Sequence, residues 1–543
     1  MQEPAPSRES AVDPRIVHWI LCAVSIALLV FAALRFFFGG GFDALLSSDA
    51  SVPALLAEEM LRSRSLLPDT WYFANDEIWT LSPHVFVLPF VALLGVSPLA
   101  LKIGNLLVIG ATLGLVALLL RRVTGSWPFS VTIACSLLAC FSELEAAVVY
   151  VQTAYGWFCA QLALLTWLAL RMNDDRASAA RQPVWITTLY VLFVLAFGAS
   201  SPLRVLVYWM VPLAIVSIAF RLAERQSVVS KPLVLGCAAL AAGVALHWIL
   251  DRQLLTVAGT TADLVGPPRQ WMRNLAALAR DVPVLAGSQS TWSQLATPSS
   301  VAGIVRNAFM VLAPIVAVLA WRRSATGHVE DRLFMRLAGA MLVVVIGAFA
   351  LRPRSGDSAS IRYLVPQLLL GLAALMAWLW RRWGASSRRL IAVTALFVLA
   401  FGGGGALLAT KLASASGSAP SDCGASVSIC RLQASLLEHG LHKGYATYWN
   451  AGVTTLASRA RVTVCGIVLK PRIAPFRWLV SKDCFDPPRE DRYFIALSAN
   501  DREGLDRNAL IAETGPPDEI VKDGAFEILI YETMRSRLAW LSR

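Results

Sequence analysis

The chain has 543 residues, of which 56% are hydrophobic and 15% are charged, and its net charge is +12. One soluble core cannot bury that much apolar surface, so the composition excludes an ordinary soluble protein and predicts repeated bilayer-spanning helices. The arginines stand in short clusters between apolar runs. The positive-inside rule explains this pattern without a nucleic-acid partner.

The polar N-terminus, residues 1–15, precedes an apolar run over 16–38. This run is too long for the apolar core of a signal peptide, and no small-residue cleavage site follows it. We therefore expect an uncleaved first span, followed by further apolar runs of spanning length. The predicted spans are 16–38, 99–121, 127–142, 148–170, 184–199, 203–221, 232–250, 303–321, 333–351, 362–380 and 389–410.

Clusters of basic residues occupy every second connection between these spans. They lie at 121–122, 171–181, 221–231, 322–336 and 381–389. The positive-inside rule places them in the cytoplasm, whereas loop 39–83, with seven acidic residues against two arginines, belongs outside. An odd number of crossings must then separate that loop from Arg121. The apolar stretch 84–98, which Pro89 and Pro98 interrupt, is accordingly predicted to be an interfacial or partly buried helix.

This topology gives about 11 transmembrane helices, an inside N-terminus and an outside C-terminus. We expect a membrane domain over 16–410, with outer loops 39–98 and 251–302, and a small periplasmic α/β domain over 411–543. A helix around 270–279 in the second loop would either gate an acceptor or lie on the membrane. The expected helix and strand segments of the α/β domain are 432–439, 445–449, 462–468, 493–497 and 526–531.

All the cysteines after the last predicted span form an even set, namely Cys423, Cys430, Cys465 and Cys484. An oxidising compartment would pair them, in any of three connectivities. We favour the local pairing, 423 with 430 and 465 with 484, although the sequence does not decide between the three.

The first outer loop holds the most informative residues. Asp49 follows two serines and is a good candidate for the N-cap of an amphipathic helix at the membrane surface. This helix carries Val52, Leu55, Leu56, Glu59 and Met60. An aromatic strip then precedes Asp76 and Glu77. A carboxylate held at the interface suits a general base, although the same residues equally suit a helix cap and a solvated pair.

This layout resembles the GT-C membrane glycosyltransferases, especially bacterial relatives of protein O-mannosyltransferases and of lipid A aminoarabinose transferases. The resemblance rests on an inside first span, an acidic outer loop opening with Asp49, the helix "AEEMLRSRSLLP" and the aromatic-acidic segment. It implies a polyprenyl-phosphate sugar donor, Asp49 as the catalytic base, and Asp76 or Glu77 as a second acidic site. The family often has Glu after the Asp, where this chain has Ala50, and no metal ligand set is expected.

Two further segments resemble the same family. "FGASSPLR" supplies Arg204 as a cation for a lipid-linked phosphate, and "SIRYLVP" supplies Arg362 for the phosphate and Tyr363 for the sugar site. Each residue is also ordinary at a membrane interface, where arginines extend toward the headgroups and tyrosines gather. The tail phrase "HKGYATYWNAGVTTLAS" is similar to segments that follow the last span in this superfamily.

These features predict an inner-membrane glycosyltransferase that moves a sugar from a polyprenyl phosphate to a periplasmic glycan, lipid or protein. The histidines show no metal-ligand spacing, and no nucleotide motif is present, as expected for an enzyme that draws on a lipid-linked donor. One alternative is a transporter or flippase for a lipid-linked glycan, which should carry ionisable residues within its spans and an internal repeat. A second alternative is a non-catalytic envelope scaffold, which the missing Glu after Asp49 leaves open.

Overall fold

The chain is described from a computed structural model. The structure describes residues 13–79, 81–173, 183–225, 229–253, 255–258, 265–288, 297–323, 329–352, 358–415, 423–470, 472–486, 492–503, 505–532 and 541.

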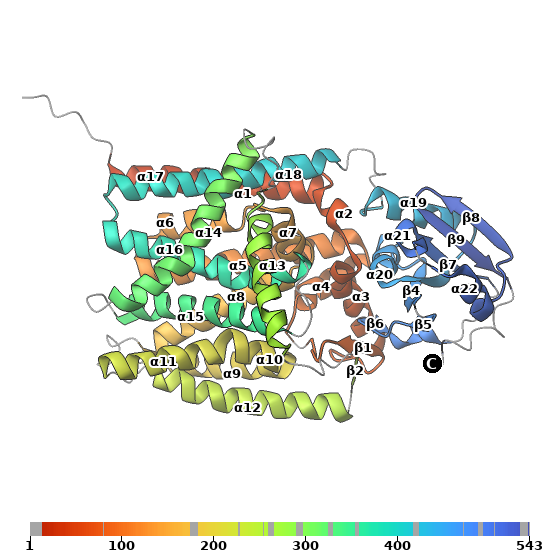
Figure 1. Ribbon diagram of the computed structural model, residues 1–543, viewed down its shortest axis with the longest axis horizontal. Helices are drawn as coiled ribbons and strands as arrows, with labels where there is room; N and C mark the ends of the chain where they lie inside the picture. The colour runs from red at the N-terminus through yellow and green to blue at the C-terminus, as the bar shows by residue number, and fades with distance from the viewer. Residues whose placement is uncertain are drawn as a thin grey trace, which may run out of the picture.

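A bundle of long apolar helices forms most of the molecule, and an α/β part occupies one end of it (Figure 1). Within the described residues, eight helices are long and apolar enough to cross a membrane, and a bent pair raises the number to nine. The chain is therefore a multi-pass membrane protein. The helices of the bundle are α1 (Pro14–Phe38), α5 (Pro98–Thr124), α6 (Trp127–Leu137), α7 (Glu143–Glu145), α8 (Ala154–Met172), α9 (Val184–Ser200), α10 (Pro202–Val205), α11 (Val211–Glu224), α12 (Ser230–Gln253), α13 (Pro268–Leu285), α14 (Pro298–Arg323), α15 (Val329–Leu351), α16 (Val365–Trp383), α17 (Arg388–Phe397) and α18 (Gly404–Ala415).

Every predicted span coincides with helical structure, although two differ in detail. The span expected over 127–142 ends as helix α6 at Leu137, because the chain turns sharply at Cys140, which has a positive φ of 63°. The next span begins with a π-helix at Ala146–Val151 and bends by 75° before α8. Short π or 3-10 segments also occur in other spans or at their ends, at Leu206–Met210, Ser358–Leu364 and Val398–Gly403.

Ion pairs and hydrogen bonds join the predicted basic connections to one another at one end of the bundle. Arg122 pairs with Glu330, Arg336 pairs with Glu224 at 2.7 Å, and Arg381 pairs with Asp331 at 3.1 Å. The Val229 amide donates to Asn173 at 3.1 Å. All five basic connections therefore lie on the same face, as the alternation of charge predicts.

The acidic loop and the other predicted outer connections meet at the opposite end. The residues that flank helix α4 (His84–Leu94) contact the start of α8 and the acidic loop. Before α4, Leu81 accepts a hydrogen bond from the Trp157 indole at 2.8 Å; after it, Lys102 forms an ion pair with Asp43 at 2.7 Å. Helix α4 has only 11 residues, fewer than a helix needs to cross a bilayer.

The C-terminal part is a six-stranded mixed sheet in the order β5-β4-β3-β7-β9-β8. Its core strands are parallel, with Tyr445 opposite Cys465 on one side and Ile495 on the other. The strands are β3 (Lys443–Thr447), β4 (Thr463–Val468), β5 (Ala474–Pro475), β7 (Tyr493–Ser498), β8 (Glu519–Asp523) and β9 (Phe526–Tyr531), and the helices are α19 (Val427–Glu438), α20 (Tyr448–Ala457), α21 (Ala499–Arg502) and α22 (Arg507–Thr514). The α/β expectation is thus confirmed, except that the strand predicted over 445–449 ends at Thr447, where α20 begins.

Two disulfides stabilise this part, Cys423–Cys430 and Cys465–Cys484, which confirms the local pairing. The first fixes the start of α19, and the second joins β4 to the short 3-10 helix Lys482–Phe485. The two disulfides close loops with sequence separations of 7 and 19, and in the chain-entropy model each stabilises the folded state by about 2–4 kcal/mol.

A second, three-stranded sheet joins the two parts of the molecule. Its central strand β1 (Trp71–Ala74) comes from the first outer loop and pairs with β2 (Thr256–Ala258) of the second loop. On its other edge β1 pairs with β6 (Val480–Ser481) of the C-terminal part. Three segments far apart in sequence thus share backbone hydrogen bonds, and this holds the C-terminal part against the acidic loop (Figure 1).

Candidate functional site

Helix α3 (Ser48–Ser63) carries Asp49 in its first turn. The N-cap position belongs to Ser47, whose backbone is extended, so the prediction that Asp49 caps the helix is wrong. A negative charge in the first turn is still favoured by the helix dipole. The side chain of Asp49 points out of the turn instead of back onto the backbone, and is therefore available to other groups.

The prediction that α3 lies on the membrane surface is also wrong. Apolar residues such as Val52, Leu56 and Met60 are buried, because α4 covers one side of α3 and α20 covers the other. The approach of α20 is close at Gly452, where an added Cβ would lie 2.6 Å from the Ser51 hydroxyl. The helix that carries Asp49 is therefore enclosed by the C-terminal part.

Two side chains from distant segments hold the Asp49 carboxylate. The Tyr448 hydroxyl, at the start of α20, donates to Oδ1 at 2.5 Å, and Nη1 of Arg362 lies 3.7 Å from Oδ2. The side chains of Asp49 and Arg362 are 22% and 25% exposed, so the pair is half-buried and open to a ligand. Burial raises the pKa of Tyr448 above its usual range and the Asp49 charge adds to this effect, so the phenol stays protonated and remains a donor.

Glu77 forms a second acidic position on the same face. Asn75 and Asp76 both have positive φ, 62° and 53°, and the Glu77 amide donates to Ala74 at 3.2 Å, which makes this a tight turn of the type I′ kind. The turn directs Glu77 to Arg204, whose Nε lies 2.5 Å from its carboxylate. Burial raises the pKa of Glu77 above its usual range, while the Arg204 charge acts in the opposite direction.

Aromatic rings connect the two acidic positions. The ring of Tyr155 lies 5.9 Å from that of Tyr363 and 6.1 Å from that of Phe158, and the Arg204 guanidinium lies 4.5 Å above Phe158. The hydroxyl of Tyr208 donates to the Tyr363 carbonyl at 3.4 Å. Arg204 and Arg362 thus border one aromatic cluster, from opposite sides of Tyr155.

A third arginine, Arg352, belongs to this cluster. Its guanidinium lies 5.0 Å from the ring centre of Tyr363, and that of Arg362 lies 5.7 Å from the same centre. Nη1 of Arg352 and Nε of Arg362 are buried and have no hydrogen-bond partner among the described residues. Buried donors without a partner are costly, so these two nitrogens suit a bound anion, and guanidinium groups fit phosphate well.

The structure brings Asp49, Arg362 and Tyr363 together, and it pairs Glu77 with Arg204 nearby. Asp76 lies half-buried in the turn beside Glu77. Sequence reasoning missed Arg352 and Tyr448. A signal existed for both: Arg352 directly follows an apolar span on the outer side, and Tyr448 lies in the tail phrase "HKGYATYWNAGVTTLAS".

Helix α13 of the second outer loop holds the backbone at Arg352 in place. Asn274 of α13 is buried and donates to the carbonyls of Ala350 and Arg352, each at 3.1 Å. The helix expected around 270–279 is therefore packed against the end of α15 instead of lying free on the membrane. It fixes the backbone from which Arg352 extends.

No group of three or more His, Cys, Asp or Glu side chains suitable for a metal ion occurs within the described residues. His84 is buried, and its Nδ1 has no partner in this part of the chain. A small cavity of about 40 Å³ borders Glu77, Arg204 and Tyr208. A larger one, of about 320 Å³, lies between α3 and the C-terminal part.

Comparison with known proteins identifies the fold. No protein-family model matches the chain, and no curated protein matches it. Among solved structures, ArnT from Cupriavidus metallidurans bound to undecaprenyl phosphate is similar over 93% of this chain and 97% of its own, with 12% identity and a TM-score of 0.51. The same protein in the apo state gives 11% identity over the same shares, also with a TM-score of 0.51. The chain therefore has a fold similar to that of ArnT.

Proposed function

We propose that the chain is a glycosyltransferase that moves a sugar from a polyprenyl phosphate to a periplasmic acceptor. The observation that carries this proposal is the half-buried Asp49 carboxylate, held by Tyr448 and lying beside arginines with unpartnered donors. The similar ArnT binds undecaprenyl phosphate, which makes this lipid the first donor carrier to test here.

In the proposed reaction Asp49 accepts the proton of the acceptor hydroxyl. The acceptor oxygen forms a bond to the anomeric carbon, and the bond from that carbon to the phosphate oxygen breaks. The electron pair leaves on the phosphate, where Arg362 and Arg352 stabilise the developing charge. Direct displacement inverts the anomeric configuration, and Asp49 then releases its proton to water.

The remaining candidates have supporting roles in this proposal. Tyr363 lies beneath both guanidinium groups and fixes their planes, as aromatic rings do for arginine. Arg204 is a second cation for the donor, and its charge is balanced by Glu77. Asp76 and Glu77 form a second acidic site toward the sugar.

We further propose that the reaction takes place outside the bacterial inner membrane, with the N-terminus in the cytoplasm. Two observations support this orientation. The face opposite the site holds all five basic connections, and the two disulfides lie on the side of the site.

The test is mass spectrometry of envelope glycans and lipids from a deletion strain. The strain is complemented with wild type, with Asp49→Asn, or with the control Asp523→Asn, which changes a carboxylate at the far edge of the C-terminal sheet. We expect a sugar that is lost on deletion and is restored by wild type and the control, but not by Asp49→Asn at equal membrane levels. Restoration by Asp49→Asn would refute the assignment of the base. A deletion that alters no glycan would instead favour transport or a scaffold.

A further inference from the structure

The larger cavity, of about 320 Å³, lies between α3 and the C-terminal part. Pockets that bind small molecules begin at about this size. One wall is α3, and the others are α20, β4 and the segment that contains β6. The cavity is therefore formed only when the acidic loop and the C-terminal part are in contact.

Aromatic rings form one side of this cavity. Trp478 and Phe476 are stacked at 5.7 Å with an interplanar angle of 20°, and Phe476 meets Tyr448 edge-on at 5.3 Å. Trp71 also lines the cavity; it is 2% exposed, and its indole Nε1 has no hydrogen-bond partner among the described residues. A buried donor left unpaired is costly, so this indole suits a hydroxyl acceptor from a ligand.

Carboxylates outnumber cations in the lining of this cavity, which disfavours an anion. Arg62 is bound by Glu59 at 2.7 Å and by Asp483, and the Lys443 ammonium donates to the backbone carbonyl of Asp483 at 3.0 Å. The carboxylate of Glu58, by contrast, forms no hydrogen bond with another described residue. The cations of the cavity are thus occupied while a carboxylate is free to accept.

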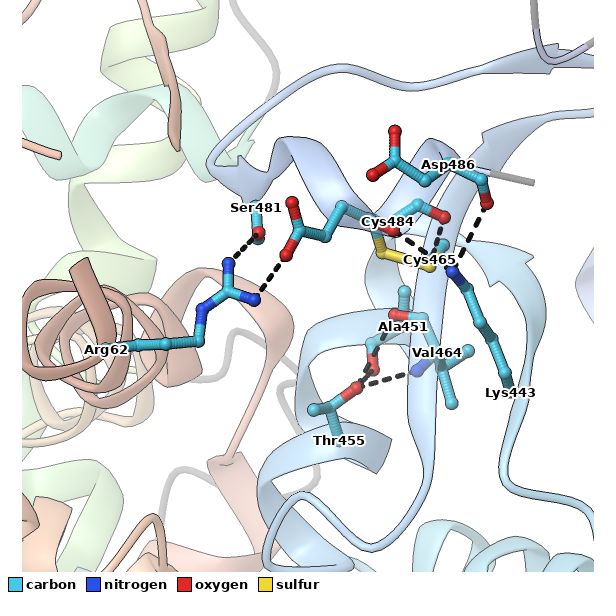
Figure 2. Close-up of a disulfide and its surroundings, with 10 residues drawn as sticks. Arg62, Lys443, Ala451, Thr455, Val464, Cys465, Ser481, Cys484 and Asp486 are labelled. Carbon is cyan, nitrogen blue, oxygen red and sulfur yellow. Dashed lines mark hydrogen bonds and ion pairs between the residues drawn. A yellow bond between two sulfur atoms is a disulfide. The ribbon is translucent and has the colours of Figure 1, made fainter. Parts of the chain in front are cut away.

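Figure 2 shows the contacts that hold the C-terminal part against α3 at this cavity. Arg62 extends from α3 toward Ser481, and the disulfide Cys465–Cys484 joins β4 to the 3-10 helix that carries Asp483. Thr455 of α20 receives a hydrogen bond from the Val464 amide at 2.9 Å, which holds α20 against β4. The disulfide and these hydrogen bonds therefore hold α3, α20, β4 and the 3-10 helix around the cavity.

We propose that this cavity binds a saccharide ring, and this inference rests on the proposed transferase function. A sugar ring has an apolar face of C–H groups, which stacks on aromatic rings, and an edge of hydroxyls that donate to carboxylates and accept from an indole. Trp478 and Phe476 provide the stacking surface, Glu58 the acceptor and Trp71 the donor. An acyl chain would leave Glu58 unpaired, and a phosphate would face carboxylates.

Tyr448 connects the cavity to the candidate base. Its ring lines the cavity, while its hydroxyl binds Asp49. Ser48, the neighbour of Asp49, lines the cavity as well. A bound saccharide therefore extends toward Asp49, whether it belongs to a glycan acceptor or is the sugar of the donor.

Saturation-transfer NMR on the purified full-length protein in detergent tests this proposal. The probes are the methyl glycosides of glucose, galactose, mannose and N-acetylglucosamine, with the peptide Ala-Ala-Ala as the alternative ligand class. We expect transfer to the ring protons of at least one glycoside, and an affinity about tenfold lower in Trp478→Ala, because stacking on a central aromatic ring is lost. The control Trp127→Ala removes an exposed tryptophan at the opposite face and should bind as wild type does.

Each outcome either supports or overturns the saccharide site. No transfer to any glycoside, transfer to the peptide alone, or equal binding by Trp478→Ala would overturn the saccharide site. Displacement of the bound glycoside by synthetic undecaprenyl-phosphate glucose would assign the site to the donor sugar, and persistence of the signal would assign it to the acceptor. Glycoside binding by a protein without transferase activity would retain this site and refute the proposed function, whereas transfer without glycoside binding would do the reverse.

Discussion

The hydrogen bond from Tyr448 to Asp49 is the contact on which the proposed site depends most. Tyr448→Phe removes only the hydroxyl and keeps the ring against Phe476. A hydrogen bond to a charged group contributes about 1.5–3 kcal/mol. Since Asp49 is 22% exposed and water can replace the phenol in part, we expect the lower end of that range.

A double-mutant cycle separates the free energy of the Tyr448–Asp49 interaction from the other effects of each substitution. Tyr448→Phe, Asp49→Ala and the double variant are unfolded with denaturant in detergent micelles, and the free energies of unfolding are compared. We expect a coupling energy of about 1.5 kcal/mol. Since an interaction changes the rate only where its strength differs between the free enzyme and the transition state, the cycle measures the contact in the folded protein and not a catalytic contribution.

A matched control uses Tyr531→Phe, whose hydroxyl lies 3.1 Å from Thr514 Oγ1 instead of near Asp49. Its cycle with Asp49→Ala should be additive within about 0.5 kcal/mol. If the Tyr448 cycle is additive to the same degree, the two side chains do not interact in the folded protein. The reasoning that places the C-terminal part in the site would then be refuted.

Two further predictions concern the neighbouring charges. Arg352→Ala should weaken the binding of undecaprenyl phosphate about tenfold in a thermophoresis assay, because the unpartnered nitrogen of Arg352 would contact the phosphate. The control Arg280→Ala removes an exposed arginine and should bind as wild type does. Equal affinities of Arg352→Ala and wild type would exclude Arg352 from the phosphate site. Burial raises the pKa of Glu58, and the charge of the adjacent Glu59 raises it further. The charged form of Glu58 therefore destabilises the fold, and Glu58→Gln should have a higher melting temperature than wild type at pH 8. This advantage should shrink as pH falls through the folded-state pKa and vanish below the unfolded value of about 4.3, whereas an equal gain at pH 4 would contradict it.

The membrane fold followed from the sequence because charge and hydropathy act locally. Each basic connection is marked by its own arginines, and the described residues of all five connections lie on one face. The same count of charges predicts that α4 stays on the outer side. The breaks in the helices did not follow, since the turn at Cys140 and the 75° bend before α8 depend on packing between helices and not on any helix-breaking residue nearby.

The site was predictable only in part, for a physical reason. Asp49, Arg362 and Glu77 lie in short segments with a recognisable arrangement, so local pattern was enough to find them. Tyr448 lies 399 residues from Asp49 along the chain, and nothing in the local sequence says that α20 packs on α3. The same packing explains why α3 is not a surface helix: its second apolar face is covered by a part of the chain that sequence periodicity cannot place.

The C-terminal part contributes directly to the candidate site. It supplies a hydrogen bond to the candidate base, a strand that pairs with β1 of the acidic loop, and the aromatic side of the larger cavity. Any movement of α20 away from α3 would remove the Tyr448 bond and open that cavity at once. The arrangement of Asp49 and the shape of the cavity beside it are consequently coupled, so a ligand that fills the cavity also stabilises the base in its bonded position.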